Sequence, residues 1–490
     1  MIALLLAGGS GTRFWPLSRE GFSKQFLKIG GTDTLLQQTF ERAKRRVPAD
    51  RIYVVTRRDQ AYTTFQQLGP RGLDPSRLYA EPAGRNTAPA IALVARLLEN
   101  RHPDEVMAVF PTDHVIRRPE VFLDALGQAE GLARQGYLVL LGVPPTGPET
   151  GYGYMEAGEP LEGGPGRAVK RFHEKPDRPT AEGYLKHEGM YWNSGMFVWT
   201  VRRILEAIEK TQPALSEALR TIARHARPAP GKAPFVELDE EGKAAFAALE
   251  PVSIDQGVLE RADRIAMVPA EMGWSDLGTW DALGAVFPAD ADGNIVSGRA
   301  VALDCSDTII QGDSRLIAAL GLNNLMVVDT PDALLVCPKD RAQDVKRLVD
   351  HLRAQKREEV HRSVTVSKPW GSFTDLARQP GFLVKRIDVL PGHQLSLQSH
   401  RHRAEHWMVL SGKARVELEG RICNLEAQDS IHIPKGARHR LSNPSDEPLV
   451  LVEIQIGDRL SENDIIRYQD DYGRTGNLEN PTGPSGSPEC

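Results

Sequence analysis

The chain has 490 residues, of which 41% are hydrophobic and 26% charged, and a formal net charge of −5. This length exceeds what one hydrophobic core supports, so two or three domains are expected. The small negative charge gives no reason to expect nucleic acid or an acidic membrane as a partner. The four cysteines show no C-x-x-C spacing, which argues against a disulfide framework or a zinc finger and fits a reducing compartment.

The N-terminal run MIALLLAGG lacks the basic start and the length of a signal peptide. No other run approaches the ~18 apolar residues that a membrane helix needs. We therefore expect a cytoplasmic protein that makes no membrane contact.

Residues 1–288 alternate short apolar runs with amphipathic stretches, as doubly wound α/β domains do. Strands are predicted at residues 2–7, 52–56, 106–110 and 137–143, and helices at residues 34–46, 89–100 and 119–134. The predicted strands are apolar on both faces, which suits a parallel sheet covered by helices.

The pattern then changes twice. Residues 289–358 contain short β-type runs separated by turns, which predict a small stacked-β subdomain followed by a charged linker helix at residues 340–358. Residues 359–472 are β-rich with frequent turn signals, the pattern of a sandwich or barrel. The tail, residues 473–490, has the composition of a disordered segment.

Residues 5–19 read LLAGGSGTRFWPLSR, a glycine-rich turn that follows an apolar run and carries an arginine. Glycines let backbone N–H groups approach an anion and form a concave nest around it. The stretch matches neither the P-loop pattern nor G-x-G-x-x-G, which disfavours ATPases of that class and dinucleotide oxidoreductases. By itself such a turn is as often structural as functional.

This stretch, together with the following KQFLKIGG, resembles the signature of the sugar nucleotidyltransferases, in particular the mannose-1-phosphate guanylyltransferases. Seven further segments follow in the order typical of that family: EPAGRNTAPAI, FPTDH, TGYGYM, FHEKPD, YWNSGMFVW, SIDQGVLE and GWSDLGTWDAL. The resemblance implies transfer of GMP from GTP to mannose-1-phosphate, giving GDP-mannose and pyrophosphate, with Mg²⁺ as cofactor.

The resemblance also implies roles for individual residues. The nucleotide-binding set is Leu6, Ala7, Gly8, Gly9, Ser10, Gly11, Thr12, Arg13, Lys24, Glu81, Arg85, Asn86, Thr87 and Asp113. Arg13 and Lys24 would neutralise phosphate charge during transfer. Guanine presents N–H donors, so an acceptor such as Glu81 is expected opposite the base.

Asp113 and Asp276 each follow an apolar run, near the strand ends where open α/β sheets bind ligands. The resemblance makes them the Mg²⁺ ligands, whereas without it an aspartate after a strand is interpreted as a helix N-cap. The implied sugar-binding set is Tyr152, Gly153, Glu174, Lys175, Asn193, Ser194 and Asp255, with Lys175 holding the sugar phosphate.

A second concentration of chemistry lies in QSHRHRAEHW (residues 398–407) and IPKGARHRLSN (residues 433–443). Gln398, His400 and His402 alternate along a predicted strand and would share one face. Two imidazoles beside a carboxylate can hold a divalent metal, and the alternative is a solvated basic strand with incidental histidines.

The spacing resembles the two cupin motifs. Gly392, His400, His402, Glu405 and Gly412 match the first, and Pro434, Gly436, His439 and Asn443 match the second. The implied metal ligands are Gln398, His400, His402, Glu405 and His439, for a transition metal such as Zn²⁺ or Co²⁺. Only two residues separate His402 from Glu405, where three or four are usual, so Gln398 or His406 could replace Glu405. Gln428 stands where the second motif begins with glycine.

QSHRHRAEHWMVLSGKA, with KPWGSF before it and ENDIIRYQDDYGR after it, resembles the type II phosphomannose isomerases, which are fused to guanylyltransferase domains. This implies interconversion of fructose-6-phosphate and mannose-6-phosphate through an enediol. Arg440 would bind phosphate or the enediolate, and Lys385 and Glu453 are further proton-transfer candidates; the sequence does not select the base.

Two alternatives stay open. The chain could be a guanylyltransferase whose cupin is catalytically silent and senses sugar or supports oligomerisation. It could instead be a nucleotide-sugar-binding regulator with an inactive transferase domain, which the intact set of Arg13, Lys24, Asp113, Lys175 and Asp276 disfavours. A homo-oligomer, most simply a dimer, is expected.

Overall fold

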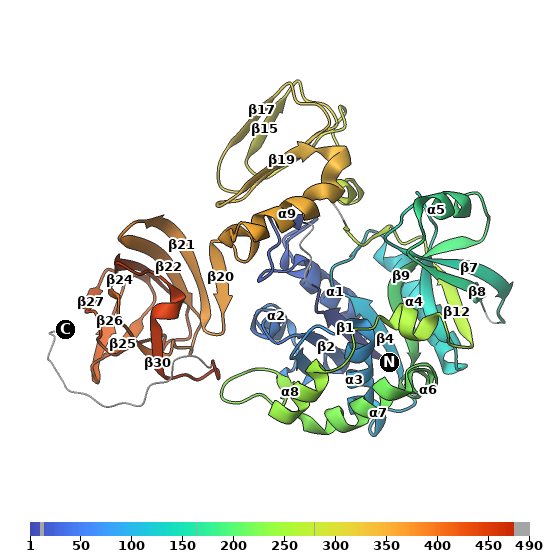
Figure 1. The fold of residues 1–490 in the computed structure, drawn as a ribbon, viewed down its shortest axis with the longest axis horizontal. Coiled ribbons are helices and arrows are strands. Elements are labelled where there is room, and N and C mark those ends of the chain that lie inside the picture. The colour runs from blue at the N-terminus through green and yellow to red at the C-terminus, as the bar shows by residue number, and fades with distance from the viewer. Residues whose placement is uncertain (10–13, 163, 279, 475–490) are drawn as a thin grey trace. The chain divides into compact units, whose positions relative to one another are not determined.

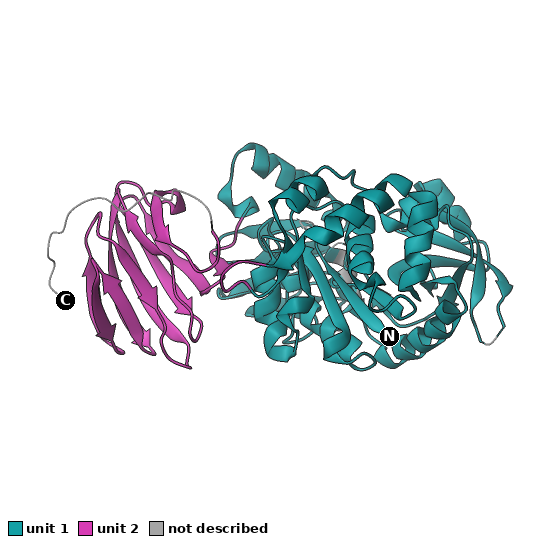
Figure 2. Ribbon diagram, turned by 90° about the horizontal axis from the view of Figure 1, so that it is seen from below, with its two compact units in different colours: residues 1–228, 234–361 teal, residues 229–233, 362–490 magenta. Residues whose placement is uncertain are grey.

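The computed structural model describes residues 1–9, 14–162, 164–278 and 280–474. The chain divides into two compact units (Figure 2). The first unit joins Met1–Pro228 with Pro234–His361, and the second joins Ala229–Ala233 with the chain from Arg362 onward. The boundaries expected at residues 288, 358 and 472 stay predictions, and nearly all of the tail expected to be disordered lies outside the described residues.

An eleven-stranded sheet forms the centre of the first unit (Figure 1). In spatial order its strands are β10 (Ala226–Pro228), β11 (Val236–Leu238), β3 (Leu78–Glu81), β2 (Ile52–Arg57), β1 (Ile2–Ala7), β4 (Val106–Pro111), β9 (Met190–Thr200), β6 (Leu138–Val143), β12 (Ile265–Pro269), β8 (Arg167–Glu174) and β7 (Gly153–Pro160). β1 runs parallel to both β2 and β4, so the chain crosses from one half of the sheet to the other beside β1. Ligands of such sheets bind outside the carboxyl ends of the strands at this crossing point.

Helices cover both faces of the sheet. They are α1 (Leu35–Lys44), α2 (Ala61–Leu68), α3 (Thr87–Glu99), α4 (Pro119–Arg134), α5 (Arg178–Tyr184), α6 (Val201–Thr211), α7 (Pro213–Ile222) and α8 (Glu240–Ala247). Ile2 and Leu4 of β1 pack into a cluster with α3, α6 and α7, while Ala3 and Leu5, which point the other way, are equally buried. Burial on both faces explains the continuous apolar run and confirms the predicted doubly wound α/β architecture.

The stacked-β subdomain is also as predicted. Its strands are β14 (Ile295–Ser297), β15 (Ala300–Leu303), β16 (Ile309–Gln311), β17 (Ile317–Leu320), β18 (Leu325–Asp329) and β19 (Leu334–Pro338). β14, β16 and β18 stack in parallel, as do β15 and β17, and β19 closes antiparallel on β18. Parallel stacking of such short strands gives a small β-helix, in which each turn buries its apolar face on the next.

The segment expected as one linker helix is a shorter helix, α9 (Val345–Ala354), between two 3₁₀ turns at Lys339–Asp344 and Glu358–Val360. Val345 and Val349 of α9 are buried in a hydrophobic cluster with Phe14 and Trp15 of the glycine-rich signature. Arg19, also in the signature, is 1% exposed and forms an ion pair with Asp332 at 2.9 Å. The signature stretch therefore packs against the β-helix and α9 within one core.

The second unit is all-β and has two sheets. One contains β20 (Thr365–Lys368), β21 (Gly371–Gln379), β22 (Phe382–Val389), β29 (Leu449–Gly457), β24 (Arg403–Ser411) and β27 (Ser430–Ile433). The other contains β26 (Arg421–Leu425), β25 (Ala414–Leu418), β28 (His439–Ser442), β23 (Leu397–His400) and β30 (Ile465–Gln469). Alternate residues of β24 and β29 are buried between the sheets, which confirms the predicted cupin barrel.

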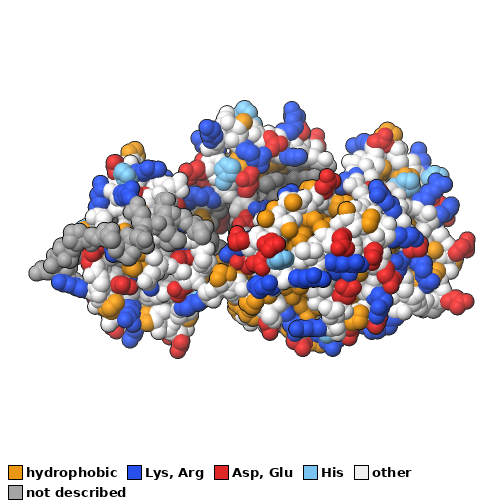
Figure 3. Space-filling view, turned by 60° about the horizontal axis from the view of Figure 1, so that its bottom comes forward, with side chains coloured by type: hydrophobic (Ala, Val, Ile, Leu, Met, Phe, Trp, Pro, Cys, Tyr) orange, Lys and Arg blue, Asp and Glu red, His pale blue; other side chains and the backbone are white. Residues whose placement is uncertain are grey.

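Basic and acidic side chains are interspersed over the face drawn in Figure 3 rather than gathered by sign. Among the helices of the described residues, none is long and apolar enough to cross a membrane.

Candidate functional sites

The end of β1 is fixed by polar side chains from three other segments. Gln25 Nε2 and Thr56 Oγ1 each donate a hydrogen bond of 2.8 Å to the carbonyl of Ala7. Thr112 Oγ1 donates to the carbonyl of Leu6 at 3.0 Å. These contacts hold the base of the glycine-rich turn, of which Gly8 and Gly9 are described while Ser10, Gly11, Thr12 and Arg13 lie outside the described residues. Gln25, Thr56 and Thr112 were not among the predicted site residues, although Thr56 ends the strand predicted at residues 52–56 and Thr112 lies two residues beyond the one predicted at residues 106–110.

The structure brings Lys24, Asp113 and Asp276 together at this edge of the sheet. Lys24 is 6% exposed, and its Nζ lies 2.7 Å from Asp113 Oδ2. The same Nζ donates to the backbone carbonyl of Asp276 at 2.5 Å. Asp113 follows β4, and Asp276 follows the short strand β13 (Trp274–Ser275), which pairs with β5 (Val115–Ile116) just beyond Asp113.

The charge of Asp113 is set by its neighbours. Burial alone would raise the pKa of this carboxyl group, but the positive charge of Lys24 and the presence of His114 lower it below its usual value. Asp113 therefore stays ionised at neutral pH, which a ligand of a hard cation requires.

An aromatic frame surrounds the two aspartates. Trp274 Nε1 donates to His114 Nδ1 at 3.1 Å, so neutral His114 carries its proton on Nε2, which lies 3.7 Å from Asp113 Oδ1. Tyr152 donates to Asp276 Oδ1 at 2.5 Å, and its ring packs edge-on against Trp274 at 5.1 Å. His114 and Trp274 lie within the motifs FPTDH and GWSDLGTWDAL, but a role for them could not be assigned from spacing.

Four of the predicted sugar-binding residues also meet. Asn193 Nδ2 donates to Asp255 Oδ1 at 2.7 Å, and Lys175 Nζ lies 2.6 Å from Glu174 Oε1. Burial, followed by the charge of Glu174, raises the pKa of Asp255 to about 6. A Cβ atom on Gly153 would lie 2.7 Å from Glu174 Oε2 and 3.0 Å from the Phe172 ring, so a side chain there would displace the Glu174 carboxylate. The cluster presents carboxylates and an amide that can bind hydroxyl groups, next to a lysine 61% exposed in its side chain.

Ser194 has a different position. Its hydroxyl donates to the carbonyl of Leu141 at 2.7 Å and is 1% exposed, inside the sheet where β9 and β6 lose their regular register. The structure thus uses the Ser194 side chain to hold two strands together.

Glu81 is the predicted base-side residue with an unused acceptor. It is the last residue of β3 and 6% exposed, and its Oε1 would lie 2.9 Å from a Cβ atom on Gly8. Its Oε2 is buried and has no hydrogen-bond partner among the described residues. Burial raises the pKa of Glu81 to about 7, although Arg57 acts in the opposite direction.

The other three base-side residues bind protein backbone. Arg85 donates to the carbonyl of Ala247, and Asn86 caps α3 by accepting from the amide of Thr87 at 2.9 Å. The Thr87 hydroxyl accepts from the amide of Ile254 at 2.8 Å. These contacts shape the loop beside Glu81.

The second unit holds a buried cluster of His400, Glu405 and His439, which are 2%, 1% and 1% exposed. His400 Nε2 lies 3.1 Å from Glu405 Oε1, and His439 Nε2 lies 3.6 Å from Glu405 Oε2. Possible ligand atoms of all three lie within 4.8 Å of one another, and in the part of the chain that the structure describes this is the one such group of three or more residues.

The protonation of the cluster suits a metal. His439 Nδ1 donates to the carbonyl of Ala437 at 2.9 Å, so the lone pair of Nε2 faces Glu405. Burial lowers the pKa of His439 to about 4, which keeps the imidazole neutral. His439 Nε2 and His400 Nδ1 are buried atoms without hydrogen-bond partners within the described residues. The neutral imidazole of His439, the imidazole of His400 and the carboxylate of Glu405 form a donor set typical of divalent transition metals.

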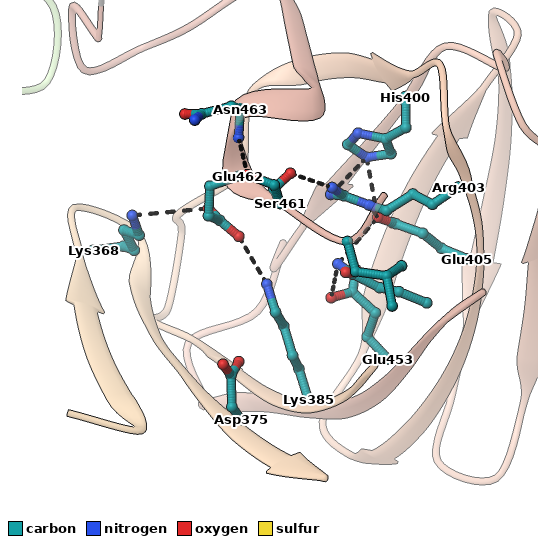
Figure 4. Close-up of polar contacts among 12 residues, drawn as sticks. Lys368, Asp375, Lys385, His400, Arg403, Glu405, Glu453, Ser461, Glu462 and Asn463 are labelled. Carbon is teal, nitrogen blue, oxygen red and sulfur yellow. Dashed lines mark hydrogen bonds and ion pairs between the residues drawn. The ribbon is translucent and has the colours of Figure 1, made fainter. Parts of the chain in front are cut away.

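Polar side chains hold Glu405 in place (Figure 4). Arg403 Nε donates to Glu405 Oε1 at 2.9 Å, and Trp407 Nε1 donates to Glu405 Oε2 at 3.2 Å. Burial would raise the pKa of Glu405, but His400, His439 and Arg403 lower it well below its usual value. The neighbouring Glu453 responds in the opposite way, because burial and then the charge of Glu405 raise its pKa to about 8.

The structure does not bring His402 to this cluster. β23 ends at His400, and the amides of Arg401 and His402 donate to the carboxylate of Asp464 at 3.2 and 3.0 Å. The chain turns there, so the predicted alternation of three side chains stops after His400. The His402 side chain is 40% exposed and lies 3.7 Å from Asp458.

His406 and Arg440 also lie away from the cluster, whereas Gln398 pairs with His439 across the sheet. Gln398 is 7% exposed and lies opposite His439 in the sheet, where it accepts from Ser396. His406 lies on the exposed side of β24. Arg440 follows His439 on β28 and faces the opposite side of the sheet, where it donates to Gln469 at 2.6 Å.

Three family matches cover most of the chain. Residues 2–293 match the nucleotidyl transferase family, residues 298–352 the MannoseP isomerase/GMP-like beta-helix domain, and residues 354–470 the mannose-6-phosphate isomerase C-terminal family. The chain belongs to the nucleotidyl transferase family. The fused isomerase-type domain places it with the two-domain members, which confirms the resemblance predicted from the motifs.

Relatives that match this chain over nearly its whole length support the same family assignment. Xanthan biosynthesis protein XanB of Xanthomonas campestris pv. campestris (strain B100) is 44% identical over 475 residues, covering 97% of this chain and 99% of the relative. Alginate biosynthesis protein AlgA of Pseudomonas fluorescens is 42% identical over 482 residues, 98% of each chain. A mannose-1-phosphate guanylyltransferase of Klebsiella pneumoniae is 39% identical over 477 residues, 97% of this chain and all (100%) of the relative.

A crystal structure described as mannose-1-phosphate geranyltransferase from Thermus thermophilus resembles this nucleotidyl transferase with a TM-score of 0.64 and 35% identity. The similarity covers 72% of this chain and 99% of that one.

Proposed function

We propose that the first unit transfers GMP from GTP to mannose-1-phosphate, with release of pyrophosphate and formation of GDP-mannose. The observation that carries this proposal is the position of Lys24, which links Asp113 to the Asp276 segment at the carboxyl edge of the sheet. The unused oxygen of Glu81 lies on one side of the signature turn, and the Glu174–Lys175 pair belongs to the sugar-side cluster.

Asp113 and Asp276 fit Mg²⁺, because a hard cation prefers carboxylate oxygens and keeps several waters. When bound, Mg²⁺ supplies positive charge next to the phosphates. Lys24 now provides the counter-charge of Asp113 and would supply a charge-assisted contact to phosphate. Glu81 would accept from the guanine N–H groups, and Lys175 would hold the phosphate of mannose-1-phosphate.

Incubation of the full chain with GTP, Mg²⁺ and mannose-1-phosphate tests the proposal. We expect pyrophosphate release that requires all three components and falls when ATP or UTP replaces GTP. Glucose-1-phosphate serves as the matched sugar control. Absence of pyrophosphate release from a folded protein with any nucleotide and sugar phosphate would overturn it and favour the binding-regulator alternative.

We further propose that the second unit interconverts fructose-6-phosphate and mannose-6-phosphate. His400, Glu405 and His439 would hold Zn²⁺ or Co²⁺, with Gln398 available beside His439. The bound ion would polarise the sugar carbonyl. The buried barrel interior would exclude water from the enediol, and Glu453 provides a second carboxyl group next to the cluster.

One observation favours the silent cupin as a second candidate. Arg403 Nη2 lies 3.3 Å from His400 Nε2 while Arg403 Nε binds Glu405, so the cluster has a counter-charge without a metal. Metal analysis of the purified chain, followed by isomerase assays after removal and return of Zn²⁺ or Co²⁺, separates the two. Metal-dependent interconversion supports the isomerase, whereas a metal-free and inactive second unit supports the silent cupin.

A further inference from the structure

Basic side chains converge on a single carboxylate inside the second unit (Figure 4). Lys385 of β22 is 5% exposed, and its Nζ lies 2.8 Å from Glu462 Oε1. Lys368 of β20 lies 4.0 Å from Glu462 Oε2. Both ammonium groups lie over the ring of Phe373, at 4.3 and 5.5 Å from its centroid. The two lysines thus form a cationic pocket with an aromatic floor, built on strands of the barrel.

Lys368, Lys385 and Arg467 surround Glu462, while the nearby Arg474 is ion-paired with Asp470. Lys368 is largely desolvated, which lowers its pKa; the charge of Glu462 acts in the opposite direction, and the charges of Arg474, Lys385 and Arg467 lower the pKa further. Arg467 Nε is buried and has no hydrogen-bond partner among the described residues. A pocket with this charge suits an anion of higher charge than one carboxylate.

Glu462 reaches the pocket from a connection and not from a barrel strand. It begins the short 3₁₀ turn Glu462–Asp464 between β29 and β30, and its side chain is 43% exposed. The anion in the pocket therefore belongs to a segment that can move without breaking a strand pairing.

The pocket lies beside the metal cluster. Lys385 stands directly opposite Glu453 in the barrel, and Glu453 stands opposite Trp407, whose indole N–H contacts both Glu453 and Glu405. Neighbouring strands are about 4.8 Å apart, so only two strand spacings separate Lys385 on β22 from β24, the strand that carries Glu405. One small molecule could reach both Lys385 and the metal cluster.

We propose that Lys368 and Lys385 form the subsite for the phosphate group of a sugar 6-phosphate, and that the Glu462 carboxylate occupies this subsite in the free protein and leaves when the phosphate binds. The proposal rests on the proposed isomerase function for the identity of the sugar. A phosphate monoester carries up to two negative charges and three terminal oxygens, enough to bind both lysines and Arg467 at once.

The same segment contacts the metal cluster. Arg403, which binds Glu405, also donates through Nη1 to the carbonyl of Ser461 at 2.9 Å. Asp464 accepts from the amides of Arg401 and His402, directly after His400. Departure of Glu462 would therefore loosen contacts on both sides of His400, so phosphate binding and the geometry of the cluster are linked.

Binding of inorganic phosphate, fructose-6-phosphate and unphosphorylated fructose to the full chain tests the subsite, by calorimetry and independently of turnover. We expect Lys385→Met and Lys368→Met each to weaken binding of both phosphate compounds by about 10- to 100-fold, the usual loss of a charged hydrogen bond. Glu462→Gln should strengthen it about tenfold by removing the competing charge. Fructose binding should not respond. Any phosphate bound by the first unit is common to all variants.

The exposed pair Lys413 and Glu426, 3.4 Å apart with side chains 68% and 73% exposed, gives matched controls, because Lys413→Met and Glu426→Gln change the same charges on the surface of the same unit. Lys385→Arg tests whether charge alone suffices in case Lys385→Met fails to fold, and should keep binding within about threefold. Added phosphate should also speed hydrogen exchange of the amides of Arg401 and His402.

The outcomes separate this proposal from the isomerase itself. Lysine-dependent phosphate binding in a protein without isomerase activity supports the subsite and overturns the activity. Normal isomerase with an unchanged KM for fructose-6-phosphate in folded Lys385→Met and Lys368→Met overturns the subsite. Weaker phosphate binding in Glu462→Gln overturns the displacement step, because Glu462 would then support the lysines instead of competing with the ligand.

Discussion

The two candidate sites of this nucleotidyl transferase are built in opposite ways. In the first unit, the charged groups stand at strand ends and in loops, and the side chains of Asp113 and Lys175 are 34% and 61% exposed. In the second unit, His400, Glu405 and His439 are at most 2% exposed and belong to the barrel interior. An exposed group loses little when its partner is removed, whereas a buried polar group left unpaired costs free energy of folding. Substitutions of the exposed groups in the first site should therefore mainly affect activity, whereas those in the second should affect activity and stability together; Lys24, at 6% exposed, is the exception in the first site.

The largest effect is expected from the carboxylates of the first site. Asp113→Asn and Asp276→Asn keep the shape and one oxygen but lose the charge, and should each lower transferase kcat/KM by about 10²–10³-fold. Isomerase activity should stay at the wild-type level, while Asp113→Asn should also lower the melting temperature of the first unit, because it leaves the buried Lys24 without its counter-charge. Pyrophosphate release measured over a range of Mg²⁺ concentrations checks this, and excess Mg²⁺ should restore part of the rate. Full activity at limiting Mg²⁺ would identify the residue as a cap or spacer.

The corresponding change in the second site is His439→Ala. It removes a neutral imidazole from a fully buried cluster, so isomerase activity should fall by more than about 100-fold, the loss that even the outer partners of metal ligands cause. Unlike the aspartate variants, it should also lower the stability of the second unit, measured by hydrogen exchange of the amides of β24 and β29 at increasing urea concentration. Transferase activity should be unchanged. Loss of both activities in a folded variant would show that the two sites depend on each other.

A smaller effect concerns pH and applies only to the buried site. The pKa of Glu453 is raised to about 8 in the folded protein, so as pH rises from about 4.5 to 8 the unfolded chain releases a proton that the folded chain retains, and stability falls. The pKa of His439 is lowered to about 4, so stability also falls as pH drops from about 6.5 to 4.

Glu453→Gln imitates the protonated form and should remove the alkaline loss. Relative to wild type, the metal-free variant should gain about 3 to 4 kcal/mol between pH 5 and pH 8. Urea unfolding at both pH values in the presence of a chelator measures this. The exposed Glu426→Gln serves as the control and should show no such gain. An equal difference from wild type at both pH values would mean that Glu453 is ionised in the folded protein.

Much of this architecture could be predicted from local pattern. The strand at residues 2–7 and the helix at residues 119–134 were predicted with the bounds that β1 and α4 have, because a run apolar on both faces and a proline at the first helical position are local signals. The expected helix at residues 340–358 was too long, since its ends form 3₁₀ turns that pack with the signature stretch.

The errors in the site have a long-range cause. Alternation placed His402 beside His400, but the strand ends because Asp464, 62 residues further along, accepts the amide of His402. Glu462 and Lys385 are 77 residues apart, and their contact has no local signature. Gln25 and Thr56 bind backbone carbonyls, which any residue could supply, so no side-chain motif reveals them. Local periodicity predicts elements, whereas the contacts that end strands and orient side chains come from elsewhere in the chain.

The smallest effect is expected at Arg440, which the sequence analysis placed among the catalytic residues. Successive side chains of a strand point to opposite faces, so Arg440 points away from the face where His439 meets Glu405. It donates to Gln469 and lies 3.9 Å from Glu417, beside a cavity that includes Gly392, Arg415 and Ser442. Arg440→Ala should therefore change isomerase kcat/KM by less than about twofold, while Lys385→Met raises the KM for fructose-6-phosphate. Steady-state kinetics of both variants, measured in parallel, decide on which face of the sheet the phosphate binds. A large KM increase in Arg440→Ala with none in Lys385→Met would place the phosphate on the outer face. The second site would then be an exposed site and not an interior one.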